Sequence, residues 1–239
     1  MTGGPPDVLV RVDRLTKRYR GLVAVDAASF SVCRGEVLGL IGPNGSGKTT
    51  LFACLGGVLP YESGRVETFT PDGIPSLFYL PDSITPWPDQ TVGWALRFAH
   101  EYFGSPAGAP AEWVDPLGLQ EVLAKRMREL SKGQRKRVLL AIGLLTPHPI
   151  LLLDEPFDGL DLRQTRQVAQ LLRSVAANGR TLFLSIHQIA DAARVCDRFV
   201  LLSGGRVCGE GTLAELASCL PQPPSGGGEA LEDVFLALT

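Results

Sequence analysis

The sequence predicts an α/β protein with a parallel-sheet core, a small antiparallel β lobe and a helical lobe inserted into the core. Two apolar runs carry this prediction, Val37–Ile41 and Ile150–Leu153, because strands buried on both faces of a parallel sheet are continuously hydrophobic. A glycine-rich turn at 42–49 follows the first run, and a helix is expected after the turn. Strand, turn and helix in this order are the context in which a phosphate-binding loop is found.

The turn fits the pattern G-x-x-x-x-G-K-[ST], whose backbone N–H groups close on phosphate oxygens. Its residues are Gly42, Pro43, Asn44, Gly45, Ser46, Gly47, Lys48 and Thr49, and Thr50 opens the helix. We expect Lys48 to reach the β- and γ-phosphates and the Thr49 hydroxyl to ligate Mg²⁺. The alternative is a chance glycine-rich turn, which the strand, the lysine and the hydroxyl together disfavour. The sequence therefore predicts binding of a nucleoside triphosphate.

Composition narrows the classes of function. A chain of 239 residues can form one sizeable α/β domain with a smaller lobe, and its net charge of −2 supplies no electrostatic case for binding nucleic acid. We find no signal-peptide pattern and no apolar run near the roughly 20 residues of a membrane-spanning helix. The scattered cysteines form no C-x-x-C pair, which favours reduced thiols in a soluble cytosolic protein over zinc or redox chemistry. They are Cys33, Cys54, Cys196, Cys208 and Cys219.

The segment before the core predicts the antiparallel lobe. Short strands are expected at Val8–Val12, Leu22–Val25 and Phe30–Val32, joined by tight turns. Tyr19 precedes the phosphate loop, where its ring could stack on the adenine base; by itself an exposed tyrosine would be ordinary surface.

The whole chain, 1–239, is expected to be one nucleotide-binding domain. The nucleotide core and antiparallel lobe would occupy 8–81 and 147–220, and the helical lobe 82–146. The last part, 221–239, would be a flexible linker followed by a short helix.

The helical lobe is predicted from loop and helix signals. The proline-bearing segment 82–89 predicts a stiff loop, and Thr91 would cap an amphipathic helix at 92–103. A short helix is expected near 121–125, and Ser131 would cap a helix ending near 146, ahead of two prolines.

Three polar residues follow buried strands of the core. Asp154 would hold the Mg²⁺ shell, and Glu155 would polarise an attacking water. His187 follows the strand expected at 180–185, where its imidazole could donate to the γ-phosphate. Taken alone, an Asp-Glu pair is usually a solvated turn and a histidine at a strand end is usually structural. Because the same chain also has a phosphate loop, catalytic roles are favoured for these three residues.

The order of these motifs resembles the ATP-binding subunit of ABC transporters. The resemblance runs from Val8 to Gly211 and includes the phosphate loop, the segment 130–134, the strand that ends at Asp154-Glu155, Gly159-Leu160-Asp161 and His187. It implies an Mg²⁺-dependent ATPase that binds two ATP molecules between two head-to-tail copies. A homodimer would suffice, on the cytoplasmic face of the membrane beside a membrane-spanning permease subunit.

The resemblance also implies individual roles. Tyr19 matches the adenine-stacking aromatic, Glu155 the catalytic base and His187 the switch histidine. In the signature segment, Ser131 and Gly133, which precede Gln134, would touch the γ-phosphate bound by the partner copy. Asp161 would belong to the loop that crosses the dimer interface.

Two positions depart from the family pattern. Lys132 replaces a glycine, where it could add positive charge near phosphate. Asp82 stands where a glutamine normally contacts Mg²⁺ and reports to the membrane subunit. A carboxylate can still ligate Mg²⁺, so we expect a working contact at Asp82; the alternative is a side chain that points to solvent.

The sequence leaves open which process the ATP-binding protein serves. The compact chain and its C-terminal tail resemble subunits that export drugs, lipids or polysaccharides. A soluble ABC-type ATPase and a regulatory subunit that only binds ATP are the alternatives. Aromatic residues of the helical lobe would form its small core or expose a docking surface. They are Trp87, Trp94, Phe98 and Trp113. The resemblance implies a groove beside this lobe that receives a short helix of the membrane subunit, bordered by the loop 82–89.

Overall fold

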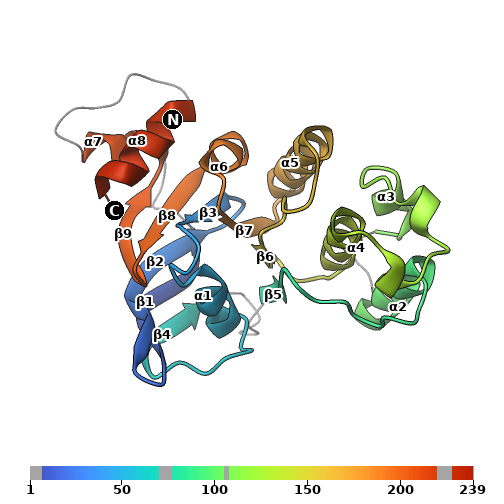
Figure 1. The fold of residues 1–239 in the computed structure, drawn as a ribbon, viewed down its shortest axis with the longest axis horizontal. Coiled ribbons are helices and arrows are strands. Elements are labelled where there is room, and N and C mark those ends of the chain that lie inside the picture. The colour runs from blue at the N-terminus through green and yellow to red at the C-terminus, as the bar shows by residue number, and fades with distance from the viewer. Residues whose placement is uncertain (1–6, 70–76, 105–107, 220–227, 239) are drawn as a thin grey trace.

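The computed structural model describes residues 7–69, 77–104, 108–219 and 228–238, and the features below belong to these residues. Its centre is a six-stranded sheet of order β5-β6-β7-β3-β8-β9 (Figure 1). The first five of these strands run parallel, and β9 pairs antiparallel with β8 across a turn at Gly204-Gly205. Their bounds are β3 (Val37–Ile41), β5 (Leu77–Leu80), β6 (Ile150–Asp154), β7 (Thr181–Ile186), β8 (Arg198–Ser203) and β9 (Arg206–Gly211).

The middle of this sheet is buried on both faces, as continuous apolar runs predict. Every residue of β3, β6 and β7 is buried. Alternate side chains enter two cores: Leu151 and Leu153 pack toward α5 (Leu162–Ala177) and the helical lobe, while Leu152 packs toward α1 (Lys48–Leu55) and the second sheet. The predicted α/β class with a parallel core is confirmed.

The second sheet is antiparallel, in the order β2-β1-β4. Its strands are β1 (Val8–Tyr19), β2 (Leu22–Cys33) and β4 (Ser63–Thr68). The prediction of several short strands was wrong here, because pairing continues through irregular positions. Arg14 and Ala27 take φ values of 47° and 50°, and the Ala27 N–H donates to Thr16 Oγ1 at 3.1 Å. Local bulges of this kind let polar residues interrupt the alternation without ending a strand.

The helical lobe lies at one end of the molecule (Figure 1). It holds α2 (Val92–Phe103), α3 (Ala111–Val114) and α4 (Lys132–Leu144), with 3-10 turns η1 (Gln120–Val122) and η2 (Met127–Glu129). The Thr91 side chain accepts from the Trp94 N–H, so α2 begins where the sequence predicts. The short helix expected near 121–125 is the single turn η1.

The C-terminal part packs on the edge of the core. Helix α6 (Ile189–Val195) lies against α8 (Gly228–Leu238), and α7 (Leu213–Ser218) packs against α8 and β9. Leu231 and Val234 of α8 are fully buried. The predicted linker 221–228 lies outside the described residues except for Gly228. None of the described helices is long and apolar enough to cross a membrane.

The bulge at Ala27 gives the first prediction. Ala27 is exposed and left-handed, a conformation that costs a residue with a Cβ roughly 1–2 kcal/mol and a glycine little. After glycine's greater loss of backbone entropy, we expect Ala27→Gly to raise the free energy of unfolding by about 0.5–1 kcal/mol. Urea denaturation measures it. The neighbouring Ala28, fully buried in the strand, is the control: Ala28→Gly should destabilise, and equal losses from both changes would contradict the bulge.

Candidate functional site

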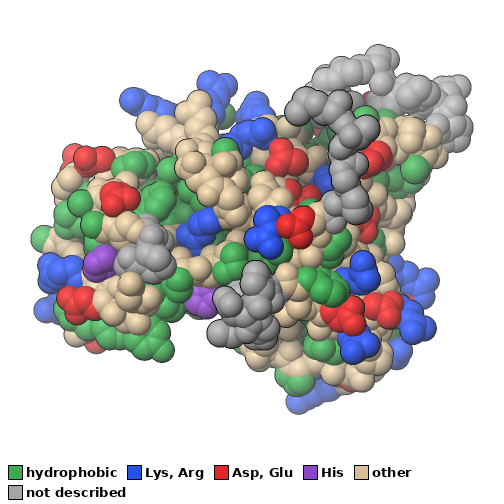
Figure 2. Space-filling model, turned by 180° about the vertical axis from the view of Figure 1, so that it is seen from behind, with side chains coloured by type: hydrophobic (Ala, Val, Ile, Leu, Met, Phe, Trp, Pro, Cys, Tyr) green, Lys and Arg blue, Asp and Glu red, His purple; other side chains and the backbone are tan. Residues whose placement is uncertain are grey.

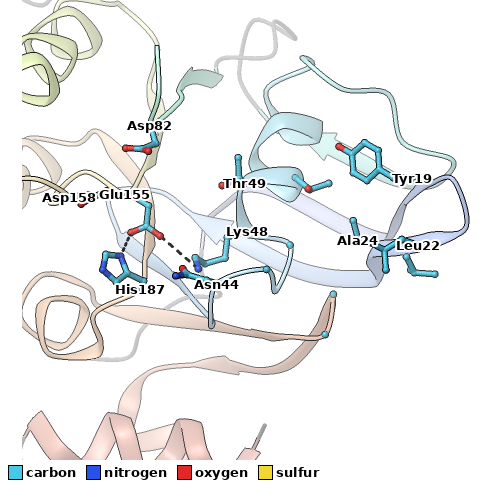
Figure 3. Close-up of a pocket in the computed structure, with 16 residues that line it drawn as sticks. Tyr19, Leu22, Ala24, Asn44, Lys48, Thr49, Asp82, Glu155, Asp158 and His187 are labelled. Atoms are coloured by element: carbon cyan, nitrogen blue, oxygen red, sulfur yellow. Dashed lines mark hydrogen bonds and ion pairs between the residues drawn. The ribbon is translucent and has the colours of Figure 1, made fainter. Parts of the chain in front are cut away.

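The polar residues of the candidate site meet at the carboxyl ends of three neighbouring strands. β3 and β6 both flank β7, with Ile41 opposite Ile186 and Asp154 opposite Ser185. The loops that follow these strands therefore open at one edge of the sheet. A cavity of about 820 Å³ lies there, between the phosphate loop, the β6 and β7 ends and the antiparallel sheet (Figure 3).

The phosphate loop is shaped by close backbone contacts. Gly47 has φ 105°, and a Cβ there would lie 2.2 Å from the Ala24 carbonyl oxygen of β2. The Gly205 N–H, from the β8–β9 turn, donates to the Ser46 carbonyl oxygen at 3.0 Å. Lys48 is 7% exposed, and its ammonium donates to the carbonyl oxygens of Gly42 and Pro43 at 2.8 and 3.2 Å. The loop is thus fixed by elements far away in sequence.

Glu155 lies between two partners across the cavity (Figure 3). Its Oε1 is 3.8 Å from Lys48 Nζ, and its Oε2 is 2.6 Å from His187 Nδ1. Its backbone is left-handed, φ 49°, and its N–H donates to the Ser185 hydroxyl at 3.0 Å. The Glu155 carboxylate is therefore held facing the cavity, beside the residue that the sequence assigns to the phosphates.

Asp154 lies behind the cavity wall and is 2% exposed. The Ser185 hydroxyl donates to one carboxylate oxygen and the Tyr79 hydroxyl to the other, the latter at 3.3 Å. Burial, followed by the nearby Asp154 charge, raises the pKa of Tyr79, so its hydroxyl stays protonated. The sequence analysis missed Ser185 and Tyr79. The available clue was Ser185 itself, a polar residue near the end of the apolar stretch of β7; its place opposite Asp154 is known only from the strand register.

Two further carboxylates line the cavity, and both pair with lysines of α4. Asp82 Oδ1 accepts from Lys136 Nζ at 2.6 Å, and Asp82 Oδ2 accepts from the Ser83 hydroxyl at 2.8 Å. Burial acts to raise the pKa of Asp82, but these hydrogen bonds outweigh it and hold the pKa below its ordinary value. Asp158, which the sequence analysis did not single out, forms an ion pair with Lys132.

Tyr19 lines the far end of the cavity, beside Leu22 and Ala24 of β2 (Figure 3). The ring is 41% exposed, and the Lys17 ammonium lies 5.2 Å from its centre. An accessible aromatic face beside apolar side chains suits a flat base. Tyr19 lines the cavity, and the adenine contact expected of it stays a prediction.

The cavity gathers most, but not all, of the predicted site residues. Those that line it are Tyr19, Asn44, Gly45, Gly47, Lys48, Thr49, Thr50, Asp82, Glu155 and His187. Gly42, Pro43 and Ser46 belong to the loop but do not line the cavity.

The signature residues lie outside the cavity of their own chain. Ser131 caps α4 and exchanges hydrogen bonds with Gln134, and Asp161 caps α5. A Cβ on Gly133 would lie 2.4 Å from the Gly159 carbonyl oxygen, so this close approach requires glycine. Within one copy these four residues thus have local structural roles.

A phosphate loop follows the buried strand β3, and acidic residues lie at the end of β6, which is separated from β3 by β7. This arrangement defines the class of P-loop nucleotide-binding proteins. Within this class, the sequence profile of the ABC transporter family matches residues 25–158, more than half of the chain. The chain belongs to the ABC transporter family, among its ATP-binding proteins, and this family binds and hydrolyses ATP.

Relatives and solved structures agree with this assignment. A Nod factor export ATP-binding protein of Ralstonia nicotianae is 33% identical, covering 87% of this chain and 68% of that protein. A daunorubicin resistance ATP-binding protein of Streptomyces coeruleorubidus is also 33% identical, covering 88% and 70%. The structure of an ATP-binding subunit of an ABC transporter gives a TM-score of 0.83 at 28% identity, over 96% of this chain and 99% of that one.

The contacts of Ser185 give the second prediction. Ser185→Ala removes the hydroxyl that donates to Asp154 and accepts from the Glu155 N–H. We expect the rate of ATP hydrolysis to fall by about 10–100-fold, because Asp154, which the sequence analysis expects to bind Mg²⁺, would lose a hydrogen bond that orients it. Steady-state phosphate release measures this. Ser31→Ala, which removes a hydroxyl bound to Glu210 outside the cavity, is the control. A Ser185→Ala protein as active as the wild type would contradict this role.

Proposed function

We propose that this chain is an Mg²⁺-dependent ATPase subunit that works as a dimer and powers a separate membrane-spanning subunit, in the direction of export. The observation that carries the proposal is the placement of Glu155 between Lys48 and His187 at the mouth of a cavity fit for a nucleotide. A phosphate-binding lysine, a carboxylate and an imidazole at one edge of a sheet form the minimum set for hydrolysing a terminal phosphate.

Each of the three side chains has its own role in the hydrolysis of ATP. Lys48 binds the anionic phosphates and withdraws charge from the terminal group. Glu155 faces the same space, where its carboxylate orients and polarises the attacking water. His187 is within hydrogen-bond distance of Glu155, so it fixes the carboxylate and can donate to the terminal phosphate.

The donors around the cavity fit Mg²⁺, a hard cation that prefers oxygen ligands. Thr49 offers a hydroxyl, and Asp154 and Asp82 offer carboxylates. The carboxylates are already oriented by partners, Asp154 by two hydroxyls and Asp82 by Lys136. These three residues would hold the ion, and its charge would offset that of the phosphates.

A second copy of the chain would complete the site. Ser131, Gly133 and Gln134 lie at the start of α4 and outside their own cavity; Ser131 is exposed, Gln134 is half-buried and Gly133 is buried. The N-terminus of a 13-residue helix is a favourable place for phosphate. In a head-to-tail pair, this end of one copy would cover the cavity of the other, with Asp161 at the crossing.

An aromatic surface on the helical lobe supports a membrane partner. The rings of Trp87, Trp94, Phe98 and Tyr102 contact one another in sequence, and Trp94 and Phe98 are stacked with centroids 5.0 Å apart. Trp87 and Trp94 are half-buried, whereas Tyr102 is 72% exposed. Seen from behind, apolar side chains reach the surface of this lobe (Figure 2). These aromatic residues beside the 82–89 loop would receive a short segment of the permease.

The relative named for Nod factor export supports the direction of transport, and a second relative is named for daunorubicin resistance. Because those two names refer to chemically different compounds, they do not point to one cargo.

Replacing the catalytic carboxylate gives the third prediction. Glu155→Gln keeps the size of the side chain and removes the base, so hydrolysis should fall by at least about 100-fold while MgATP still binds. Size-exclusion chromatography with light scattering should then show an MgATP-dependent dimer. Glu232→Gln, on the exposed side of α8, should hydrolyse ATP as the wild type does. A Glu155→Gln protein that binds MgATP and stays monomeric would refute the composite site.

Capture from detergent-solubilised membranes of the native cell gives the fourth prediction. A polytopic membrane protein should accompany the wild-type chain in stoichiometric amount, and Phe98→Ser with Tyr102→Ser should lose it because the aromatic surface is broken. Leu236→Ser, at 70% exposure on α8, is the matched control and should retain the partner. If only soluble proteins accompany the wild-type chain, the transporter assignment is wrong.

A further inference from the structure

The cavity wall carries more negative charge than a phosphate site tolerates without compensation. Asp82, Glu155 and Asp158 all line the space that would hold a polyphosphate. Each carboxylate left unpaired would repel this ligand, and the repulsion is strong where water is partly excluded. The question is which groups neutralise these carboxylates. Glu155 faces Lys48 and His187, so the other two depend on residues outside the phosphate loop.

Lys136 neutralises Asp82 from inside the protein. Its side chain is 5% exposed, that of Asp82 is 26% exposed, and their charged atoms are 2.6 Å apart. The same ammonium donates to the Asp154 carbonyl oxygen at 3.1 Å. Lys136 therefore connects the wall of the cavity to the end of β6, and burial prevents water from replacing it.

The second lysine of α4 makes a much weaker contribution. Lys132 lies one helical turn before Lys136 and pairs with Asp158, but the two side chains are 51% and 34% exposed. Exposed ion pairs are screened by water and salt, and they contribute little. If the buried pair between Lys136 and Asp82 were broken, water and salt could not replace Lys136 as the partner of Asp82.

We propose that Lys136 is a positioning residue for nucleotide binding: it neutralises Asp82 and holds this carboxylate against the end of β6, so that an aspartate can face a polyphosphate. The pair acts as one unit. Lys136 is required because residue 82 is an aspartate, and it would not be required beside a neutral side chain. This inference rests on the proposed binding of MgATP.

A double-mutant cycle separates this role from a general effect on folding. The four proteins are wild type, Lys136→Gln, Asp82→Gln and the double variant, and the measurement is ATP affinity by titration calorimetry, with Mg²⁺ and with EDTA. Lys136→Gln should weaken binding roughly 10-fold or more with EDTA, because the unpaired Asp82 charge opposes the phosphates themselves. The loss should be smaller with Mg²⁺, because the ion that Asp82 would help to hold offsets this charge. In the Asp82→Gln background the same change should alter affinity by less than about 3-fold, since the coupled partner is gone.

The control is Arg137→Gln, one residue further along α4. Arg137 donates to the carbonyl oxygens of Leu117 and Gly118 within the helical lobe, so its loss should lower the melting temperature and leave ATP affinity unchanged. If Lys136→Gln does not fold, the comparison of the double variant with Asp82→Gln still tests the proposal.

Three outcomes decide the proposal. Equal losses from Lys136→Gln in both backgrounds would overturn it, as would a Lys136→Gln protein that binds like the wild type. A wild-type chain that does not bind ATP would refute the proposed function instead.

Discussion

The site depends on the register of three parallel strands. β7 lies between β3 and β6, and the hydrogen bonds between them fix where each strand ends. A shift of one residue would turn Asp154 away from Ser185 and would move Glu155 out of reach of Lys48, because side chains alternate along a strand. The two apolar cores fix this register, since each strand must bury apolar side chains on both faces. Packing of the interior therefore sets the geometry of the polar edge.

Charge at this edge is balanced by neighbours that come from other elements. Asp154 is held by hydroxyls from β5 and β7, and Asp82 by a lysine of the helical lobe. A buried carboxylate without such partners would be too costly to keep ionised. The cavity is thus one electrostatic unit that spans the core and the helical lobe. A change in either part alters the field that a bound phosphate group experiences.

Much of the fold could be predicted because its signals are local. The apolar run Ile150–Leu153 marks a buried strand, and the capped amphipathic pattern of 92–103 marks a helix. The features that the sequence analysis missed were missed for physical reasons. The bulge at Ala27 depends on a hydrogen bond to a neighbouring strand, which no local pattern contains. The pairing of Asp82 with Lys136 joins residues 54 positions apart, so no local pattern in the sequence contains it. Motif residues were found, and most of their supporting contacts were not.

The contacts of the phosphate loop with distant segments determine which fragments of the chain can contain a complete nucleotide site. Gly47 touches the Ala24 carbonyl of the antiparallel lobe, and Ser46 accepts a hydrogen bond from Gly205, far along the chain. A fragment that starts at Val37 would contain the complete motif and yet lack one of these contacts. The eight-residue pattern 42–49 therefore indicates that a chain is related to nucleotide-binding proteins. A working pocket also requires the segments before and after this pattern that contact the loop. Expression boundaries chosen from the motif alone would remove part of the binding site.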